Sequence, residues 1–469
     1  MKVWPLKFRE NRERKYTFSD NTGVFFSADE TFLERYVHDS LNSRDLAFLD
    51  RMGLIFDPQK RSTLTAPAIR LAQRTFRSEE VGYVILVPTL RCNLNCEYCQ
   101  VSRVSENAKG FDWSEETLEQ ILKFLGSLKS PKMKVEFQGG EPLLRLDLLD
   151  QVRQFCRKRF DEVSFVVCTN LQNVSEKAWD FLSAKDTYIS TSLDGTFDEH
   201  KKNRTFEETT NQEFQSNINR AIKSWGTDKV SALPTLDPTA PPDPKEIIST
   251  YTSLGMRSIY LRRVNFQGFA RKKFSLHEET RQWSDFYRSF IEALIEHNAH
   301  TDDFVEEYYL SHLLRRIFQR GQDGHVDLRN PNWLGIDYLV VDFDGVIYPT
   351  DEARMVSRIG KVNLAIGDIR NGINHSALQQ LNSVVSNNFD PDCCECPYQA
   401  FCGLDPVDDL SRYGRVDLPR HTTMHCRTHL ELFDYVFEMI YSNDWKIKKS
   451  IAHWMDVPEF PVQLAPKIR

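Results

Sequence analysis

The chain has 469 residues, and its 60 Lys and Arg against 67 Asp and Glu give a net charge of −7. This length suggests about three domains, and 41% apolar with 27% charged residues is typical of a folded globular protein. The mild negative charge argues against a surface for nucleic acid, so we expect no nucleic-acid partner. The longest strongly apolar run, Val81–Pro88, is too short to cross a membrane, and the N-terminal residues lack a secretory signal. We therefore expect a cytoplasmic protein with no membrane partner.

The first 80 residues are expected to form a small α+β unit. Residues 16–19 and 24–27 are strand-like runs on either side of a turn-forming Asp-Asn-Thr-Gly, which predicts a hairpin. Helical patterns follow at 29–42 and 44–53. Such a unit either caps the rest of the protein or, like the small leader-recognition (RRE-like) modules that it weakly resembles, captures a peptide that adds a strand to its sheet edge.

From residue 81 onward, apolar β-branched runs alternate with amphipathic helical stretches, which is the pattern of βαβ units and a parallel sheet. Six such units predict an α/β fold with a partial (β/α)6 barrel. The expected strands are 81–88, 133–138, 163–168, 187–193, 229–235 and 257–264. The expected helices between them lie near 114–127, 146–159, 175–184, 211–225 and 244–254. Beyond them we expect helices at 278–298, 303–319 and 427–442, a strand-rich segment at 336–370, and domains at 1–80, 81–320 and 321–469.

Most of the ten cysteines are clustered, and without an export signal clustered cysteines indicate metal ligands. Cys92, Cys96 and Cys99 follow the first expected strand of the barrel with the spacing C-x3-C-x2-C. Three thiolates can hold three irons of a [4Fe–4S] cluster and leave the fourth iron open to a ligand. The alternatives are a zinc site without its fourth ligand and reduced structural cysteines.

A second motif, Gly139-Gly140-Glu141-Pro142, ends the second expected strand of the barrel. Its glycines allow a close approach of the backbone to a ligand, and its glutamate can accept hydrogen bonds from an ammonium group. Together with the cysteine triplet, this motif resembles the radical S-adenosylmethionine (SAM) superfamily. The resemblance implies that SAM binds at the open iron. It also implies contacts to SAM from Tyr98, Gly139, Gly140, Glu141, Pro142, Asn170, Ser192 and Arg204.

The second cysteine group has the spacing C-x2-C-x5-C-x23-C and consists of Cys393, Cys396, Cys402 and Cys426. Four thiolates suit a closed site for iron–sulfur or structural zinc, and the adjacent Cys394 competes with Cys393. The pattern resembles one auxiliary-cluster half of a SPASM or twitch-type domain, the cysteine-rich extension of radical peptide-modifying enzymes. The other half is missing, because Thr350 and Pro406 stand where that family has cysteines. We therefore expect two [4Fe–4S] clusters, one for SAM and one auxiliary.

Asp351 is the candidate catalytic residue. In the related sulfatase-maturating enzymes, the Asp at the corresponding place acts as a base, so the resemblance gives Asp351 the role of taking a proton while a substrate radical is oxidised. A solvated loop residue is the alternative. Asp342 and Asp344, in the same strand and turn, are less favoured candidates.

The resemblance implies that a 5′-deoxyadenosyl radical abstracts a hydrogen atom from a C–H bond of a peptide, and the auxiliary cluster favours an oxidative outcome. The chain looks most like the radical maturases of the His-Xaa-Ser peptide systems. The favoured product is a cyclophane-type carbon–carbon cross-link in a ribosomally made precursor peptide. A second maturase and a flavodoxin- or ferredoxin-type reductant are the other expected partners. The alternatives are a sulfatase-type maturase of a folded protein, a peptide epimerase and a non-enzymatic, zinc-stabilised adaptor.

Overall fold

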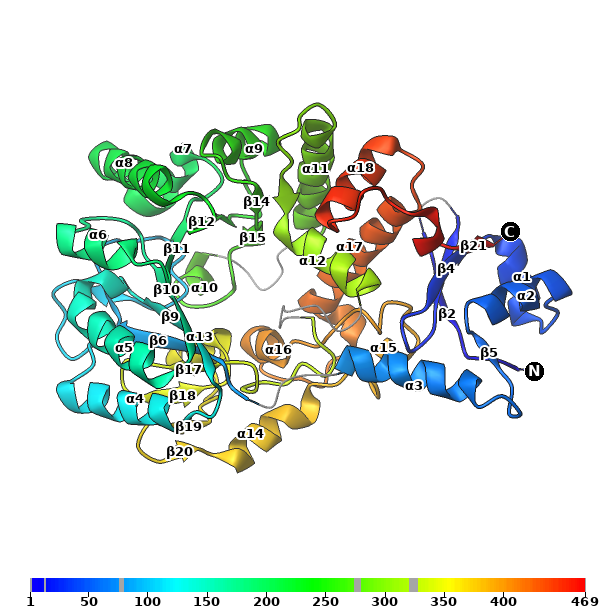
Figure 1. Cartoon of the computed structure of the whole chain (residues 1–469), viewed down its shortest axis with the longest axis horizontal. Coiled ribbons are helices and arrows are strands. Elements are labelled where there is room, and N and C mark those ends of the chain that lie inside the picture. Colours follow the sequence, from blue (N-terminus) through cyan, green and yellow to red (C-terminus); the bar gives the residue numbers. More distant parts are fainter. Residues whose placement is uncertain (1, 12–13, 76–79, 274–279, 320–327, 469) are drawn as a thin grey trace.

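The computed structural model describes residues 2–11, 14–75, 80–273, 280–319 and 328–468. Figure 1 shows an α/β part at one end, a small N-terminal unit at the other and the C-terminal helices between them, with both chain ends at the N-terminal unit. Among the described helices, none combines the length and the apolar character that a membrane span requires.

Parallel strands and their helices form the α/β part, which confirms the predicted α/β class. The strands run in the order β12-β11-β10-β9-β6 and are all parallel. They are β6 (Tyr83–Thr89), β9 (Lys132–Gly139), β10 (Glu162–Cys168), β11 (Thr187–Ser192) and β12 (Val230–Leu233). The helices that follow them are α4 (Glu115–Ser127), α5 (Leu146–Arg159), α6 (Glu176–Ser183), α8 (Glu208–Trp225) and α9 (Pro244–Ser253).

Helices α4, α6 and α9 begin where the sequence supplies a capping side chain. The side chains of Ser114 and Ser175 accept backbone N–H groups in the first turns of α4 and α6. Asp243 does the same for α9, where Pro244 fills the first helical position. The apolar faces of the helices and the sheet together bury one large core.

The expected sixth barrel strand does not join the main sheet. Residues 257–264 instead form β14 (Ser258–Ile259) and β15 (Arg262–Arg263), which pair with β16 (Glu306–Glu307) and β13 (Thr235–Leu236). The backbone N–H of Leu261 donates to the buried carboxylate of Glu307, which interrupts the strand. On its other side the main sheet continues through β17 (Leu339–Val341), parallel to β6, and then through antiparallel β18 (Val346–Tyr348), β19 (Gly367–Asp368) and β20 (Gly372–Ile373).

The expected strand-rich segment 336–370 contains β17, β18 and β19, but it also contains a helix that was not expected. After β18 the chain forms helix α13 (Asp351–Arg358). The hydroxyl of Thr350 caps this helix by accepting the N–H of Ala353 at 3.0 Å. The candidate Asp351 therefore lies in the first turn of a helix and not on a strand or in a loop.

The N-terminal unit contains the predicted hairpin. Its sheet consists of β2 (Lys7–Glu10), β3 (Tyr16–Ser19), β4 (Phe25–Ala28) and, parallel to β4, the C-terminal strand β21 (Lys467–Ile468). Around a separate small core lie β1 (Lys2–Val3), β5 (Ile55–Phe56), α1 (Glu30–Val37) and α2 (Ser43–Arg51). Helix α3 (Ser62–Thr75) follows this unit in the chain. The division of the chain at residues 80 and 320 stays a prediction, and strand pairs such as β4–β21 and β6–β17 cross it.

The predicted long helices are present as α11 (Thr280–Ala299), α12 (Tyr308–Phe318) and α17 (Met424–Tyr441). They pack with α18 (Trp445–Trp454). The remaining elements are β7 (Arg91–Cys92), β8 (Val104–Ser105), α7 (Phe197–His200), α10 (Ala270–Lys273), α14 (His375–Leu381), α15 (Pro391–Cys394) and α16 (Pro406–Tyr413), together with the short turns η1 (Pro142–Arg145), η2 (Lys201–Thr205), η3 (Asn382–Val384), η4 (Arg420–Thr422) and η5 (Val462–Leu464).

Candidate active site

The first cysteine group lies in the loop after β6, at the carboxyl end of the parallel strands. Cys92, Cys96 and Cys99 are free thiols and partly exposed. The N–H of Leu94 donates to the Sγ of Cys92 at 3.4 Å. Burial, together with Glu141 and the other two cysteines, raises the pKa of Cys92 to about 12. Bound iron would offset the mutual repulsion of three thiolates held in one loop.

The two glycines of the second motif bring the end of β9 against the chain that leads to the cysteines. Gly139 has φ +126°, and a Cβ there would lie 2.2 Å from the carbonyl oxygen of Thr89. A Cβ on Gly140 would lie 2.1 Å from the carbonyl oxygen of Arg91. The close approach is therefore made to the neighbouring backbone, which fixes the position of the cysteine loop.

Glu141 is buried, with 1% of its surface exposed, and it joins two strand ends. One carboxylate oxygen accepts the N–H of Asn170 at 2.8 Å, and the other accepts the N–H of Leu143 at 3.1 Å. Burial raises the pKa of Glu141 to about 7, against the opposite effect of these hydrogen bonds. Thr169 is a further hydrogen-bond partner, and because a carboxylate has about four acceptor positions, Glu141 can also accept a bond from a ligand ammonium. Pro142 is buried at the start of η1 beside it.

The side chain of Asn170 reaches the first cysteine group. Its amide nitrogen lies 3.7 Å from the Sγ of Cys92 and donates to Asn93 at 2.8 Å. Ser192, at the end of β11, is partly exposed and lies one strand further along the same sheet edge. Carboxyl ends of parallel strands usually carry the site in barrel proteins.

Arg204 is held by Asp194, an acid that is not among the site residues expected from the sequence. Its Nε lies 3.0 and 3.1 Å from the two carboxylate oxygens of Asp194, and its guanidinium is 5.2 Å from the ring centre of Tyr98. The hydroxyl of Tyr98 also donates to Asp194. Arg204 lies in a π-helical turn, η2, a feature that is frequent at functional sites. The signal that could have identified Asp194 is its place at the end of a strand, directly before Gly195.

The electrostatic effect of Arg204 reaches the cysteines. Burial raises the pKa of Cys96 to about 11, whereas the guanidinium of Arg204 acts to lower it. The backbone N–H of Glu97 donates to the carbonyl of Asn203 at 3.2 Å, which ties the cysteine loop to the turn of Arg204. Tyr98, Asp194, Arg204 and the cysteine loop thus form one connected cluster.

The segment after β15 covers the other side of the cysteine loop. Phe269 donates its N–H to the carbonyl of Cys99 at 2.9 Å, and Phe266 packs in a small cluster with Tyr98. Gly268 lies so close that a Cβ would meet the carbonyl oxygen of Cys99 at 2.5 Å. This segment therefore helps to position the loop that carries all three cysteines.

The second cysteine group lies between the C-terminal helices and the N-terminal sheet. The pKa of Cys393 is raised by burial, by Asp390 and by the thiols of Cys402, Cys396 and Cys426. The thiol of Cys394 instead donates to the carbonyl of Asn388 at 3.2 Å. These contacts favour Cys393 over Cys394 as the fourth member of the group.

No three His, Cys, Asp or Glu side chains of the described residues converge closely enough to hold a metal ion as they stand. An iron–sulfur cluster fits each cysteine group for three reasons. The cysteines have a suitable spacing in the sequence, thiols of one group raise each other's pKa, and thiolates are the usual ligands of such clusters. Cys92, Cys96 and Cys99 would hold the first cluster, and Cys393, Cys396, Cys402 and Cys426 the second.

Asp351 is buried and paired. Its carboxylate accepts from the Nε of Arg354 at 2.8 Å, and Arg354 is fully buried and also lies 3.7 Å from Asp342. Burial raises the pKa of Asp351, and Arg354 opposes this effect. Asp342 is fully buried and also bound by Arg358 at 3.0 Å, whereas Asp344 is exposed on the turn. Asp351 is thus the candidate that combines burial with a position beside the cavity described next.

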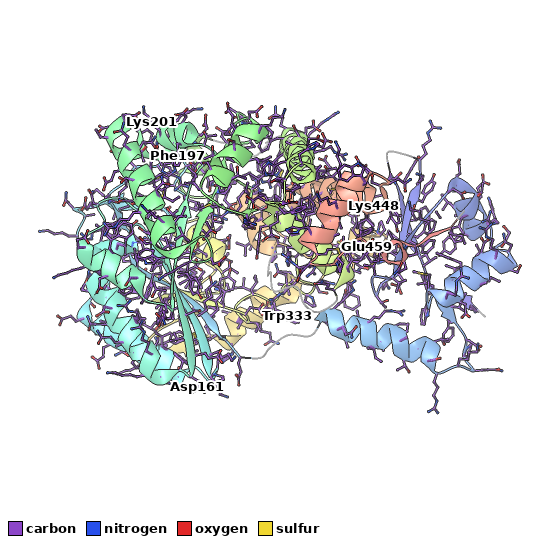
Figure 2. The ribbon with its side chains drawn as sticks, turned by 45° about the horizontal axis from the view of Figure 1, so that its top comes forward. Asp161, Phe197, Lys201, Trp333, Lys448 and Glu459 are labelled. Atoms are coloured by element: carbon purple, nitrogen blue, oxygen red, sulfur yellow. The ribbon has the colours of Figure 1, made fainter. Side chains whose placement is uncertain are left out.

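A cavity of about 280 Å³ lies between the barrel and the C-terminal helices. Thr350 and Glu352, on either side of Asp351, line one wall of it, and Trp333, labelled near the middle of Figure 2, lines another. Gln267, next to Gly268, and His425, next to Cys426, place this cavity between the two cysteine groups. Its other walls carry aromatic and charged side chains, among them Tyr260, Arg262, Trp283, Tyr309, Tyr338, Asp405 and Tyr435. Such a mixture suits a peptide segment with its side chains.

Comparisons with known proteins agree with this geometry. Residues 86–249 match the family model of the radical SAM superfamily. An uncharacterised protein of Methanocaldococcus jannaschii is 30% identical over 115 residues, which is 24% of this chain and 38% of that protein. A probable GTP 3′,8-cyclase of Methanopyrus kandleri is 33% identical over 115 residues, 24% of this chain and 35% of the relative. The chain thus spans little more than a third of the length of these two relatives.

Longer similarities exist at lower identity. The cysteine-type anaerobic sulfatase-maturating enzyme of Clostridium perfringens is 22% identical over 379 residues, 74% of this chain and 93% of that enzyme. The structure of anSMEcpe with bound AdoMet has a TM-score of 0.59 at 19% identity, over 76% of this chain and 97% of that one. Streptococcus suis SuiB bound to its precursor peptide SuiA has a TM-score of 0.50 at 13% identity, over 87% and 97%. Residues 86–249 therefore match the radical SAM superfamily, and the chain has the α/β radical SAM fold with a cysteine-rich C-terminal region.

Proposed function

We propose that this protein is a radical SAM enzyme that modifies a ribosomally made precursor peptide by oxidation and joins two of its side chains through a carbon–carbon bond. The observation that carries the proposal is the cavity lined by aromatic and charged side chains, whose walls include the chain neighbours of Asp351, Gly268 and Cys426. A peptide in this cavity would lie between a radical source and an electron acceptor. The maturases of the His-Xaa-Ser peptide systems remain the subfamily that we propose.

When bound, the first cluster and SAM would supply the 5′-deoxyadenosyl radical with one electron from a flavodoxin- or ferredoxin-type reductant, and the auxiliary cluster would take up one electron from the substrate radical. The chain itself would bind and orient the reactants. Glu141 would accept bonds from the ammonium of SAM, with Asn170 and Ser192 beside it and Arg204 held by Asp194. Asp351 would take the proton that the substrate loses together with its electron, so that charge and atoms balance.

A second candidate function is the radical maturation of a folded protein. It is favoured by the similarity to the sulfatase-maturating enzyme, which extends over 93% of that relative. The absence of cysteines at Thr350 and Pro406 speaks against it, because one auxiliary cluster of that enzyme class would be missing.

The test is peptide-dependent release of 5′-deoxyadenosine by anaerobically reconstituted protein. Two [4Fe–4S] clusters predict about eight irons per chain. Cys96→Ala should abolish release, whereas Cys156→Ala, in the buried core, should keep it. Release with precursor peptides but not with sulfatase-derived peptides supports the first function, and the reverse supports the second. Zinc in place of iron, with no release, would favour a non-enzymatic adaptor and overturn both.

A further inference from the structure

The N-terminal hairpin packs on the second cysteine group. The ammonium of Lys7, on β2, donates to the side-chain oxygen of Gln399, which lies midway between Cys396 and Cys402 in the chain. The hydroxyl of Ser19, on β3, donates to the carbonyl of Pro397. The turn between two cysteines of the group is therefore held by strands from the other end of the sequence.

Lys7 brings a positive charge to this place. Its side chain is buried, with 9% of the residue exposed, and its hydrogen-bond partner is a neutral amide. Arg9, on the same strand, is neutralised by a two-pronged pair with Asp434 at 2.8 and 3.0 Å. A buried ammonium is unfavourable unless negative charge lies close to it. Both cations of this strand act on Cys396, but Arg9 is bonded to a carboxylate, whereas Lys7 is bonded to the neutral amide of Gln399.

The groups around Lys7 point to the cysteines as the source of that negative charge. Burial lowers the pKa of Lys7, while Cys394, Cys396, Glu395 and Asp20 act to raise it. Glu395 is exposed to solvent, and Asp20 is already bonded by Thr22 and lies 3.9 Å from Arg70. Of the two cysteines, Cys396 is the proposed ligand, and the cluster that it would help to hold is the nearby anion available to Lys7.

We propose that Lys7 is the counter-cation of the auxiliary cluster and raises its reduction potential. This inference rests on the proposed function, in which the second cysteine group holds an iron–sulfur cluster. Reduction adds one electron to the cluster, and a buried cation beside it stabilises the added negative charge. The N-terminal unit would then be part of the redox site, so that an electron accepted from the substrate radical is taken up more readily when this unit is in place.

The experiment is an EPR-monitored redox titration of the full chain in which Cys92, Cys96 and Cys99 are replaced by Ala, so that only the auxiliary cluster gives a signal. Lys7→Met is compared with Lys7→Arg, which keeps the charge. Lys60→Met removes an exposed charge from the same unit and serves as the matched control. Lys7→Met should lower the equilibrium constant for reduction about tenfold, which is a shift of about 59 mV to more negative potential. Lys7→Arg and Lys60→Met should keep the original potential.

The outcomes separate the role of Lys7 from the proposed function. An unchanged potential in Lys7→Met, at equal iron content, would overturn the role of Lys7 and leave the enzyme proposal intact. Zinc instead of iron in the parent protein would overturn both. If Lys7→Met loses its iron, the Lys7→Arg variant distinguishes the two roles. Retained iron with the original potential in Lys7→Arg supports the role of Lys7 as counter-cation. Loss of iron in both variants shows that Lys7 contributes packing alone and overturns the proposed role.

Discussion

At the scale of single residues, burial changes the pH at which Glu141 ionises. The ordinary pKa of a glutamate is about 4.3, and burial raises that of Glu141 to about 7. The folded protein therefore holds this proton more tightly than the unfolded chain does. The resulting contribution to stability is fully present below about pH 4.3 and is lost as the pH rises through about 7.

Replacing Glu141 by Gln should remove this pH dependence, because glutamine does not ionise. We expect the free energy of unfolding of the original protein, relative to Glu141→Gln, to fall by about 3 kcal/mol between pH 4.5 and 8. Urea unfolding of both metal-free proteins across this range measures the difference. Burial also raises the pKa of Glu307 to about 7. Because both proteins contain Glu307, its contribution to the pH dependence cancels in the difference between them. A difference that stays constant with pH would contradict the prediction.

Asp351 is a second residue whose role a single substitution tests. Asp351→Asn removes the proton acceptor but keeps the size of the side chain, so 5′-deoxyadenosine should still form while the modified peptide falls at least about tenfold. Asp344→Asn, on the exposed turn, is the control and should keep both products. Mass spectrometry of the peptide beside chromatography of deoxyadenosine separates the two steps. An unchanged yield of modified peptide would remove Asp351 from the mechanism.

At the scale of elements, the site depends on contacts between segments that are distant in the sequence. The spacing of Cys92, Cys96 and Cys99 predicts their shared role, because these residues lie within one loop. The contact of Gly268 with that loop has no local signal, since it depends on how the segment after β15 folds back. The start of helix α13, in contrast, does have a local sequence signal. Thr350 is followed directly by two acidic residues, which is typical of the N-terminus of a helix.

Gly268 offers a test of this contact. Its φ of +54° disfavours any other residue, and a Cβ would also meet the carbonyl oxygens of Gln100 and Cys99 at 2.4 and 2.5 Å. Gly268→Ala should therefore cost about 3 kcal/mol or more and lower the iron bound by the first group. Gly226→Ala, with φ +79° and open space around it, adds backbone strain alone and should cost about 1 kcal/mol with full iron. Chemical unfolding and iron analysis check both, and equal effects in the two variants would contradict the role of Gly268.

At the scale of the whole molecule, the sequence predicts the local βα units but not the strand pairings between segments that are far apart in the chain. The alternation of apolar runs and helical stretches predicts the parallel strands β6 to β12, because each βα unit carries its own pattern. The extension of that sheet by β17, and the completion of the N-terminal sheet by β21, join segments hundreds of residues apart. Neither pairing has a signature in the two short strands that form it.

The same long-range packing decides whether the N-terminal unit is a separate module or part of one body. Phe25, on β4, is buried and lies with its ring centre 5.7 Å from that of Phe318, 6.1 Å from that of Phe401 and 5.1 Å from that of Phe437. It therefore belongs to the main core, whereas its neighbours in the sheet form a core of their own. A unit that is anchored in this way should unfold together with the rest.

We expect Phe25→Ala to destabilise the whole chain by about 3–5 kcal/mol, because it leaves a cavity where the two cores meet. Phe8→Ala, in the same sheet but 39% exposed, should cost about 1 kcal/mol. Urea unfolding followed by both circular dichroism and tryptophan fluorescence should show one transition, shifted as a whole by Phe25→Ala. An early transition that moves alone in this variant would show that the N-terminal unit folds independently, which would favour the peptide-capturing module over the cap.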